Sequence, residues 1–198
     1  TGTTVDDHAL TTSVVEISSN LLSSQAGTTE SSYTTYQIIL HLAAEVRSVY
    51  TIFGQEGSPL SIPAAYQVAT PFGSLFGGVN PVMFGVISES AYDSWLTVGV
   101  TTGSIDELSV VGLDLEEWTE TAGIESSDGG LFWMTPTDAP AGHSVVAQLT
   151  VPTGTEWTVT MSAQGISTSG RVYDESLGLF IEYRISFAPK ACSSTLKP

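Results

Sequence analysis

The chain has 198 residues, 41% of them hydrophobic, and a formal net charge of −16 at pH 7. A chain of this length and apolar content is expected to fold around a core without needing disulfides. Because 21 acidic residues stand against only 5 basic ones, the surface repels phosphate backbones and anionic lipids. We therefore expect neither a nucleic-acid partner nor insertion into a membrane.

The start of the sequence and the absence of a long apolar run predict an extracellular location. The sequence starts at Thr1 without a charged or apolar targeting segment, which is typical of a mature secreted chain. No apolar run reaches the length of a membrane span, since Glu45 and Arg47 interrupt the best candidate. Cys192 is the single cysteine and excludes an internal disulfide. We expect a secreted protein, extracellular or attached to a cell surface.

Residues 1–32 form an N-terminal arm that differs in composition from the remainder, which we predict to be one domain over 33–198. The arm is rich in Thr and Ser but contains one apolar patch over 10–22. The β-branched residues of this patch favour a strand, and a helix is the alternative. Such a patch needs a partner surface. Its candidate contact residues are Leu10, Val14, Val15, Ile17, Leu21 and Leu22.

Alternating hydrophobicity then predicts a series of strands. Over 36–42, the residues Tyr36, Ile38, Leu40 and Leu42 fall on one face. A second strand is predicted over 46–53. The segment 57–81 contains many prolines and glycines and is predicted to be a long ordered loop.

The second half of the chain continues the same pattern. We predict strands over 93–103, with Leu96 and Val98 facing the core, and over 130–134, and a short helix over 116–120. Segments 144–151 and 155–163 flank Pro-Thr-Gly and are predicted to pair as a hairpin, followed by a last strand over 177–187. Many short strands with little helix predict an all-β fold. We expect an antiparallel β-sandwich, immunoglobulin-like or jelly-roll-like, with an N-terminal extension strand.

No residue pattern predicts catalysis, so we expect no enzyme, no cofactor and no metal site. Adjacent acidic pairs such as Asp106 with Glu107, Glu116 with Glu117 and Asp174 with Glu175 point to opposite faces of an extended chain. The three histidines lack zinc-site spacing, and no loop has the alternating oxygen ligands of a calcium site. The four tryptophans favour core packing, with a sugar-stacking platform as the alternative.

Seven motifs carry a resemblance over about 49–154. They are VYTIFG at 49–54, PAAYQ at 63–67, PFG at 71–73, GGVNP at 77–81, DSWLTVG at 93–99, LFWM at 131–134 and VVAQLTVP at 145–152. In this order they resemble a secreted β-rich domain of cell-surface proteins of unicellular algae and other aquatic protists. The fold also resembles that of subunits of helical extracellular fibrils, in which the N-terminal strand of one subunit completes an immunoglobulin-like domain of another.

The resemblance implies a structural subunit that polymerises by donor-strand exchange. Its partners would be copies of itself, joined through heterologous contacts, with the apolar patch over 10–22 as the donor strand. An exposed sheet edge and an apolar groove would be satisfied together by such a strand. The alternative is a monomeric cell-surface adhesion or glycan-binding domain, which would keep the arm on its own sheet.

Overall fold

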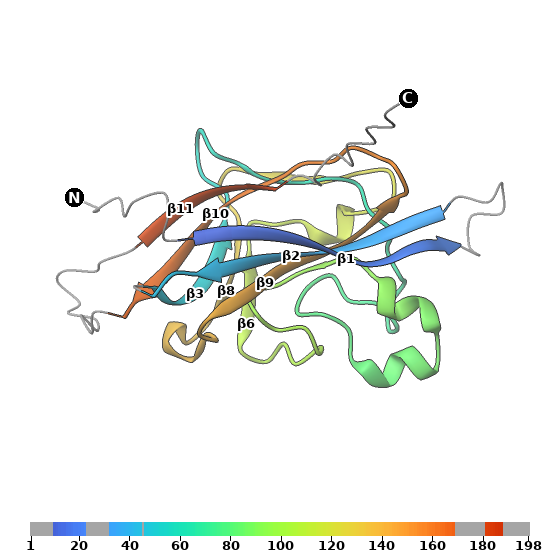
Figure 1. Ribbon diagram of the computed structural model, residues 1–198, viewed down its shortest axis with the longest axis horizontal. Coiled ribbons are helices and arrows are strands. Elements are labelled where there is room, and N and C mark those ends of the chain that lie inside the picture. The colour runs from blue at the N-terminus through green and yellow to red at the C-terminus, as the bar shows by residue number, and fades with distance from the viewer. Residues whose placement is uncertain (1–9, 23–31, 45, 169–180, 188–198) are drawn as a thin grey trace, which may run out of the picture.

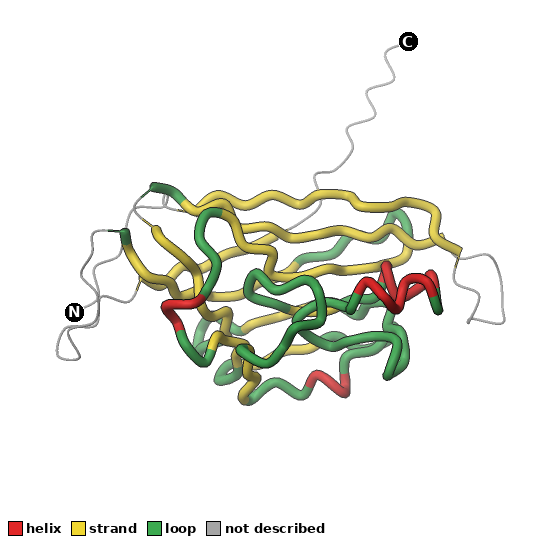
Figure 2. The backbone as a smooth tube through the Cα atoms, turned by 90° about the horizontal axis from the view of Figure 1, so that it is seen from below, coloured by secondary structure: helices red, strands yellow, loops and turns green. Residues whose placement is uncertain are grey.

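The computed structural model describes residues 10–22, 32–44, 46–168 and 181–187, which form a sandwich-like arrangement of two antiparallel β-sheets (Figure 1). These residues contain strands and short 3-10 helices but no α-helix. Figure 2 shows the long strands running side by side, with the short helices and most loops to one side of them. The predicted all-β antiparallel fold is confirmed.

Sheet A contains four strands in the order β1-β2-β9-β5. Their bounds are Leu10–Leu22 for β1, Ser32–Leu42 for β2, His143–Pro152 for β9 and Trp95–Leu96 for β5. The central strand is β2, which pairs along most of its length with β1 on one edge and with β9 on the other. The pleat of β2 therefore sets which side chains of all three strands share a face.

Sheet B contains seven strands, six of them in the order β6-β8-β3-β10-β4-β7. Their bounds are Leu108–Val111 for β6, Gly130–Trp133 for β8, Val46–Phe53 for β3, Val159–Ser167 for β10, Leu60–Ile62 for β4 and Ile124–Ser126 for β7. The seventh strand is β11 (Ile181–Phe187), which pairs with β10. Some of the same residues of β10 also pair with β3, so β11 and β3 lie on opposite edges of β10.

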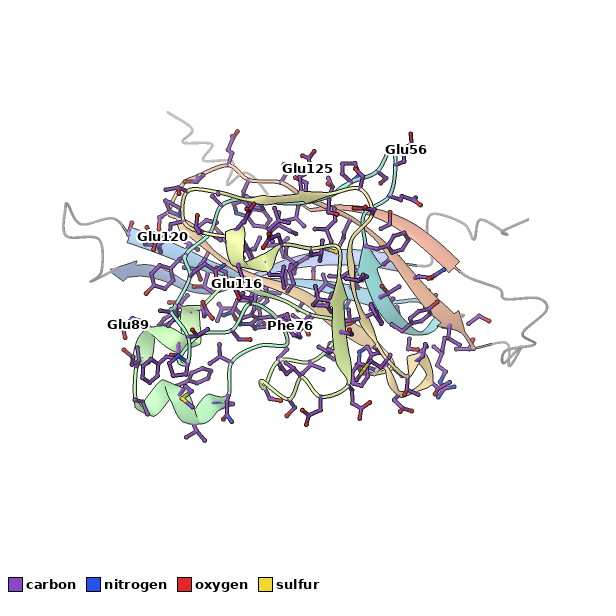
Figure 3. The ribbon with its side chains drawn as sticks, turned by 180° about the vertical axis from the view of Figure 1, so that it is seen from behind. Glu56, Phe76, Glu89, Glu116, Glu120 and Glu125 are labelled. Atoms are coloured by element: carbon purple, nitrogen blue, oxygen red, sulfur yellow. The ribbon has the colours of Figure 1, made fainter. Side chains whose placement is uncertain are left out.

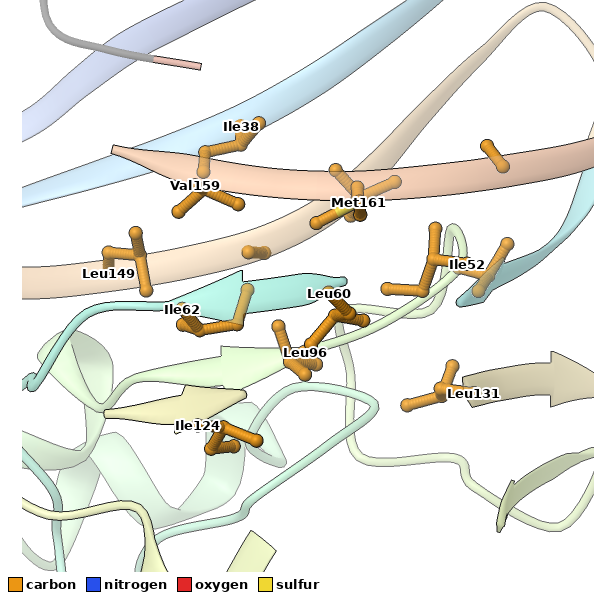
Figure 4. Packing of buried hydrophobic residues seen from close by; sticks show 14 of the residues in the cluster. Ile38, Ile52, Leu60, Ile62, Leu96, Ile124, Leu131, Leu149, Val159 and Met161 are labelled. Atoms are coloured by element: carbon orange, nitrogen blue, oxygen red, sulfur yellow. The ribbon is translucent and has the colours of Figure 1, made fainter. Parts of the chain in front are cut away.

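The core lies between the two sheets (Figure 4). On β2 the predicted alternation is confirmed, since Ile38 and Leu40 are fully buried while His41 is exposed. Sheet B contributes residues such as Ile52 and Met161, which are also fully buried. Burying each such side chain stabilises the fold by about 1.5–3 kcal/mol, so this layer holds the two sheets together.

The N-terminal patch over 10–22 is the strand β1, as its β-branched residues favoured. It pairs antiparallel with β2 of its own chain in ten residue pairs, from Leu10 opposite Leu42 to Leu22 opposite Ser32. In the single chain, residues 10–22 are therefore part of the sandwich, paired with β2. The division into an arm over 1–32 and a domain over 33–198 stays a prediction. Residues 1–9 and 23–31 lie outside the described part.

The predicted hairpin of 144–151 with 155–163 is wrong. β9 belongs to sheet A, whereas β10 belongs to sheet B, so the chain crosses between the sheets at this point. Trp157 enters the core within the crossing and is only 5% exposed. A short polar link ending in glycine suits either a hairpin or a crossover, and the turn signal alone does not separate the two.

The predicted strand over 93–103 is reduced to β5, which has two residues. The segment still follows the edge of β9, because Thr97 and Gly99 donate backbone hydrogen bonds to Val146 and Val145. Leu96 and Val98 face the core as predicted. Gly99 has φ +83° and Gly103 has φ +76°, so the backbone leaves the extended conformation that a longer strand requires.

The loop predicted over 57–81 is irregular except for β4. Two short 3-10 helices follow it, η1 (Pro81–Gly85) and η2 (Ser88–Tyr92). The helix expected over 116–120 is the 3-10 helix η3 (Leu115–Glu117), and η4 (Pro136–Asp138) precedes β9. The last predicted strand, 177–187, is described only over β11. Cys192 lies outside the described residues.

Removing a core side chain from β5 tests this packing. Leu96 is 0% exposed between the sheets, so Leu96→Ala should lower the free energy of unfolding by about 2–5 kcal/mol through lost burial and a residual cavity. Urea unfolding followed by tryptophan fluorescence measures this change. Val111→Ala is the matched control: Val111 is 59% exposed, and its loss should change stability by no more than about 0.5 kcal/mol. Equal effects of the two substitutions would contradict the core described here.

Candidate functional site on sheet A

No group of three or more His, Cys, Asp or Glu residues in the described ranges is placed to hold a metal ion. Asp106, Glu107, Glu116 and Glu117 are exposed at the surface. Asp174 and Glu175 lie outside these ranges. Within the same ranges, no helix is long and apolar enough to cross a membrane.

The tryptophans do not form an exposed sugar-stacking platform. Trp95, Trp118 and Trp157 are at most 5% exposed. Trp133 is partly buried, packs against the core and donates a hydrogen bond from Nε1 to the carbonyl of Val98 at 2.6 Å. Trp118 and Trp157 belong to the core and Trp133 packs against it, in agreement with the favoured interpretation. Trp95 is buried but lies outside this core cluster.

The six candidate contact residues of the N-terminal patch all lie on β1, but they do not share a face. Val14 lies opposite Ile38 and packs against the core, whereas Val15 and Ile17 are 41% and 48% exposed on the outer side. Leu10, Leu21 and Leu22 pair through their backbones with Leu42, Tyr33 and Ser32. Among the side chains of β1 that the structure describes, Val14 alone joins the core.

Sheet A is almost free of formal charge although the chain is strongly acidic. Glu16 is the only Asp, Glu, Lys or Arg on its four strands. The glutamates labelled in Figure 3, such as Glu56, Glu116 and Glu125, come from turns, η3 and β7 instead. Charged side chains are a common protection of sheet edges against strand addition, and the edge strand β1 has only one.

An open groove of about 500 Å³ crosses the outer face of sheet A. Its floor comes from all four strands of the sheet, and its wall comes from the segment that carries η1 and η2, which lies beside one end of β1 in Figure 1. The lining residues are Ile17, Ser18, Gln37, Val79, Pro81, Phe84, Ser90, Ala91, Tyr92, Trp95, Thr101, Thr102 and Gln148. None of them is Asp, Glu, Lys, Arg or His.

A row of amides spans the floor of the groove. Gln37 on β2 and Gln148 on β9 lie directly opposite each other, and Gln37 Nε2 donates to Gln148 Oε1 at 3.0 Å. Gln148 Nε2 in turn donates to the carbonyls of Ala91 and Asp93 at 3.1 and 2.8 Å. These bonds attach the wall of the groove to its floor. They also hold the two amide planes in fixed orientations.

Beneath the wall, Asp93 has a buried carboxylate that anchors the preceding loop. Its Oδ1 accepts from the backbone N–H of Val68 at 2.8 Å, and its Oδ2 accepts from that of Ser74 at 2.6 Å. Burial raises the pKa of Asp93 to about 7, while the hydrogen bonds from Val68, Ser74 and Ser94 act in the opposite direction. Asp93 is 0% exposed, so solvent does not reach its carboxylate. Its role is therefore structural.

Sequence patterns did not identify the residues of the groove. The alternation on β2 placed Gln37 on the face opposite Ile38, but its partner Gln148 depends on the pairing of β2 with β9. The expected hairpin of β9 with β10 concealed that pairing. Ser90 and Phe84 reach the groove through two 3-10 helices for which the sequence contains no periodic signal.

Comparisons with protein-family models, with curated protein sequences and with solved structures each returned no match for this chain. The resemblance to protist surface domains and fibril subunits therefore stays a prediction from the seven motifs.

The buried carboxylate predicts a pH dependence of stability. Asp93 has a folded-state pKa near 7 against an ordinary value of 3.8, so between these values the folded chain binds more protons than the unfolded chain. The free energy of unfolding should therefore fall as pH rises from about 4 to 7. In Asp93→Asn this fall should be smaller, by an amount on the order of a few kcal/mol. Urea unfolding at several pH values measures the slope.

A matched variant separates Asp93 from the general repulsion among carboxylates. Asp106 is exposed, so Asp106→Asn removes one negative charge without removing a buried carboxylate. It should keep a slope close to that of the unmodified chain. If Asp93→Asn and Asp106→Asn gave the same slope, Asp93 would not be the source of the dependence. An Asn side chain has one acceptor oxygen where Asp has two, so Asp93→Asn also changes the absolute stability. For this reason the pH slopes of the variants are compared, not their absolute free energies of unfolding.

Proposed function

We propose that this protein is an extracellular structural subunit that polymerises by exchange of its strand β1. In the exchange, β1 leaves β2 of its own chain and pairs with β2 of another copy in the same register. The observation that carries the proposal is the position of β1, a long edge strand with one charged residue, joined to β2 by residues 23–31. The motif resemblance supports the same function.

Exchange replaces each backbone hydrogen bond that it breaks with an equivalent one between two copies. The ten residue pairs between β1 and β2 would reform with another copy, so the closed and exchanged states differ little in hydrogen-bond energy. Concentration and the connecting segment then decide between them. Among the described side chains of β1, Val14 packs against the core and Ser13 Oγ hydrogen-bonds with His41 Nε2 at 2.7 Å, whereas Val15 and Ile17 are half exposed.

The connection between β1 and β2 is long enough for exchange. Hairpin loops usually have two to five residues, whereas nine residues separate Leu22 from Ser32. Fully extended, nine residues span about 30 Å, which is sufficient to reach a neighbouring molecule in contact. A two-residue turn would not permit this separation.

The geometry of exchange favours a filament. The donor strand and the accepting edge of β2 are different surfaces of one subunit, so the contact is heterologous and propagates unless it closes into a ring. Repulsion between subunits with a net charge of −16 opposes association. The only acidic residue on the strands of sheet A is Glu16, which lies on the donor strand itself. The contact therefore does not bring opposing carboxylates together.

Locking β1 onto its own chain tests the proposal. Replacing residues 23–31 by Asn-Gly would join Leu22 and Ser32, which are directly opposed, through a tight hairpin turn. The locked variant should fold with at least the thermal stability of the unmodified chain, because the turn shortens the loop, but it should form no filaments. Electron microscopy and sedimentation of the purified protein at increasing concentration measure assembly.

The control replaces residues 23–31 by nine Gly and Ser residues. It changes the composition of the connection but not its length, so filaments should persist. Filaments of unchanged appearance from the locked variant would show that assembly uses the free edge of β1 or another surface, and the exchange proposal would be wrong. If the unmodified chain stayed monomeric at every concentration, the monomeric cell-surface domain would be favoured instead.

The charge predicts how assembly responds to salt. With −16 per subunit, repulsion between approaching copies is screened as the Debye length falls from about 30 Å at 0.01 M to about 8 Å at 0.15 M ionic strength. Filament growth, followed by light scattering, should therefore accelerate as sodium chloride is added. Growth that slows with ionic strength would mean that attraction between opposite charges drives assembly.

A further inference from the structure

We infer that the groove on the outer face of sheet A is a binding site for a neutral saccharide. The inference does not rest on strand exchange, because the groove is complete in the single chain. It rests on the groove's lack of charge, on a buried hydroxyl without a partner, and on aromatic side chains beside fixed amides. Its volume of about 500 Å³ lies within the range of about 300–1,000 Å³ typical of small-ligand sites.

The buried hydroxyl belongs to Ser90. The residue is 1% exposed and lines the groove, yet its Oγ makes no hydrogen bond within the described part of the chain. Leaving a buried hydroxyl unsatisfied is unfavourable, so native proteins rarely do so without a reason. Because Oγ is enclosed in the chain without ligand, a ligand hydroxyl would supply the missing partner once rotation about the Cα–Cβ bond of Ser90 brings Oγ to the surface of the groove.

The floor and rim offer further polar groups. Gln37 is oriented by its hydrogen bond to Gln148, whose own two N–H groups donate to the carbonyls of Ala91 and Asp93. The hydroxyl-bearing residues Ser18, Thr101 and Thr102 also line the groove. Amides and hydroxyls both donate and accept hydrogen bonds. A ligand rich in hydroxyls, which likewise donate and accept, matches such a lining better than a ligand with a formal charge.

Aromatic side chains complete the site. Phe84 is 38% exposed and Tyr92 is partly buried, and both belong to the wall. The face of an aromatic ring carries negative charge density and packs well against the weakly positive C–H groups of a sugar ring. Such packing distinguishes a saccharide from other small polar molecules.

The electrostatics exclude anionic saccharides. A ligand with sulfate or carboxylate groups would enter a groove whose described lining has no cationic side chain, on a chain of net charge −16. A cationic ligand would find no carboxylate in the lining. A neutral ligand is therefore the class that the groove accepts.

Ser90→Ala is the most informative variant, since it separates binding from folding. Because Ser90 Oγ has no partner among the described residues, its removal should leave the unfolding midpoint unchanged or slightly raised. Binding of a neutral saccharide should weaken by about 3- to 10-fold, as expected for one lost hydrogen bond between neutral groups. Phe84→Ala should weaken binding by about tenfold, which corresponds to one aromatic contact. Met134→Ala, which removes an exposed apolar side chain outside the groove, is the control.

The probes are an array of neutral oligosaccharides, including cellohexaose, laminarihexaose and mannohexaose, with sulfated and uronic-acid oligosaccharides for comparison. Hits are titrated by calorimetry against the unmodified chain and against the locked chain. Binding confined to neutral probes and weakened by Ser90→Ala and Phe84→Ala supports the inference.

Three results would overturn the inference: no neutral probe binds, anionic probes bind equally well, or the two variants bind as the unmodified chain does. If Phe84→Ala reduced self-association while no saccharide bound, the groove would be a protein contact instead. Filaments formed by the locked chain would end the exchange proposal without affecting the result for the groove.

Discussion

The structure depends on the pairing of β2 with a strand on each side. Because successive side chains of a strand point to opposite faces, β2 sends Ile38 and Leu40 into the core and Gln37 to the outer face. Pairing transmits this alternation to β1, where Val14 lies inward and Val15 outward, and to β9, where Gln148 lies outward. A shift of either register by one residue would exchange the two faces, moving apolar side chains into water and amides into the core.

The two faces of sheet A thus have different roles. The inner face buries apolar surface against sheet B and supplies stability. The outer face combines amides and hydroxyls with the half-exposed side chains of Val15 and Ile17. The groove formed with η1 and η2 follows a row of residues from Ile17 on β1 to Trp95 on β5. The carboxylates that give the chain its net charge come from other elements. This separation leaves one face where a neutral surface or ligand can approach without strong repulsion.

The two proposals meet at β1. Ile17 and Ser18 line the groove and belong to the strand that we propose to be exchanged. If exchange occurs, the groove contains residues of two copies, and a bound ligand would contact both. A ligand that binds the groove equally in the closed and exchanged chains would not shift the equilibrium between them, since only a difference in affinity does so. The two activities are therefore compatible, and either can exist alone.

The sequence by itself determined the fold class and several elements. The β-branched patch predicted β1, the alternation over 36–42 predicted the faces of β2, and the strand over 46–53 has the predicted bounds. These features follow from local periodicity, which a single segment contains in full. The same local chemistry also indicated that Leu96 and Val98 are core residues.

The tertiary structure alone decided how the strands are partnered. Periodicity does not specify a neighbour, so β9 was expected to pair with β10 although it pairs with β2. In the single chain β1 forms one edge of sheet A, beside β2. The groove depends on these long-range partners, because Gln37 and Gln148 are more than a hundred residues apart and meet only through the register of sheet A. Strand partners are chosen by the burial of whole faces, which is a property of the complete chain.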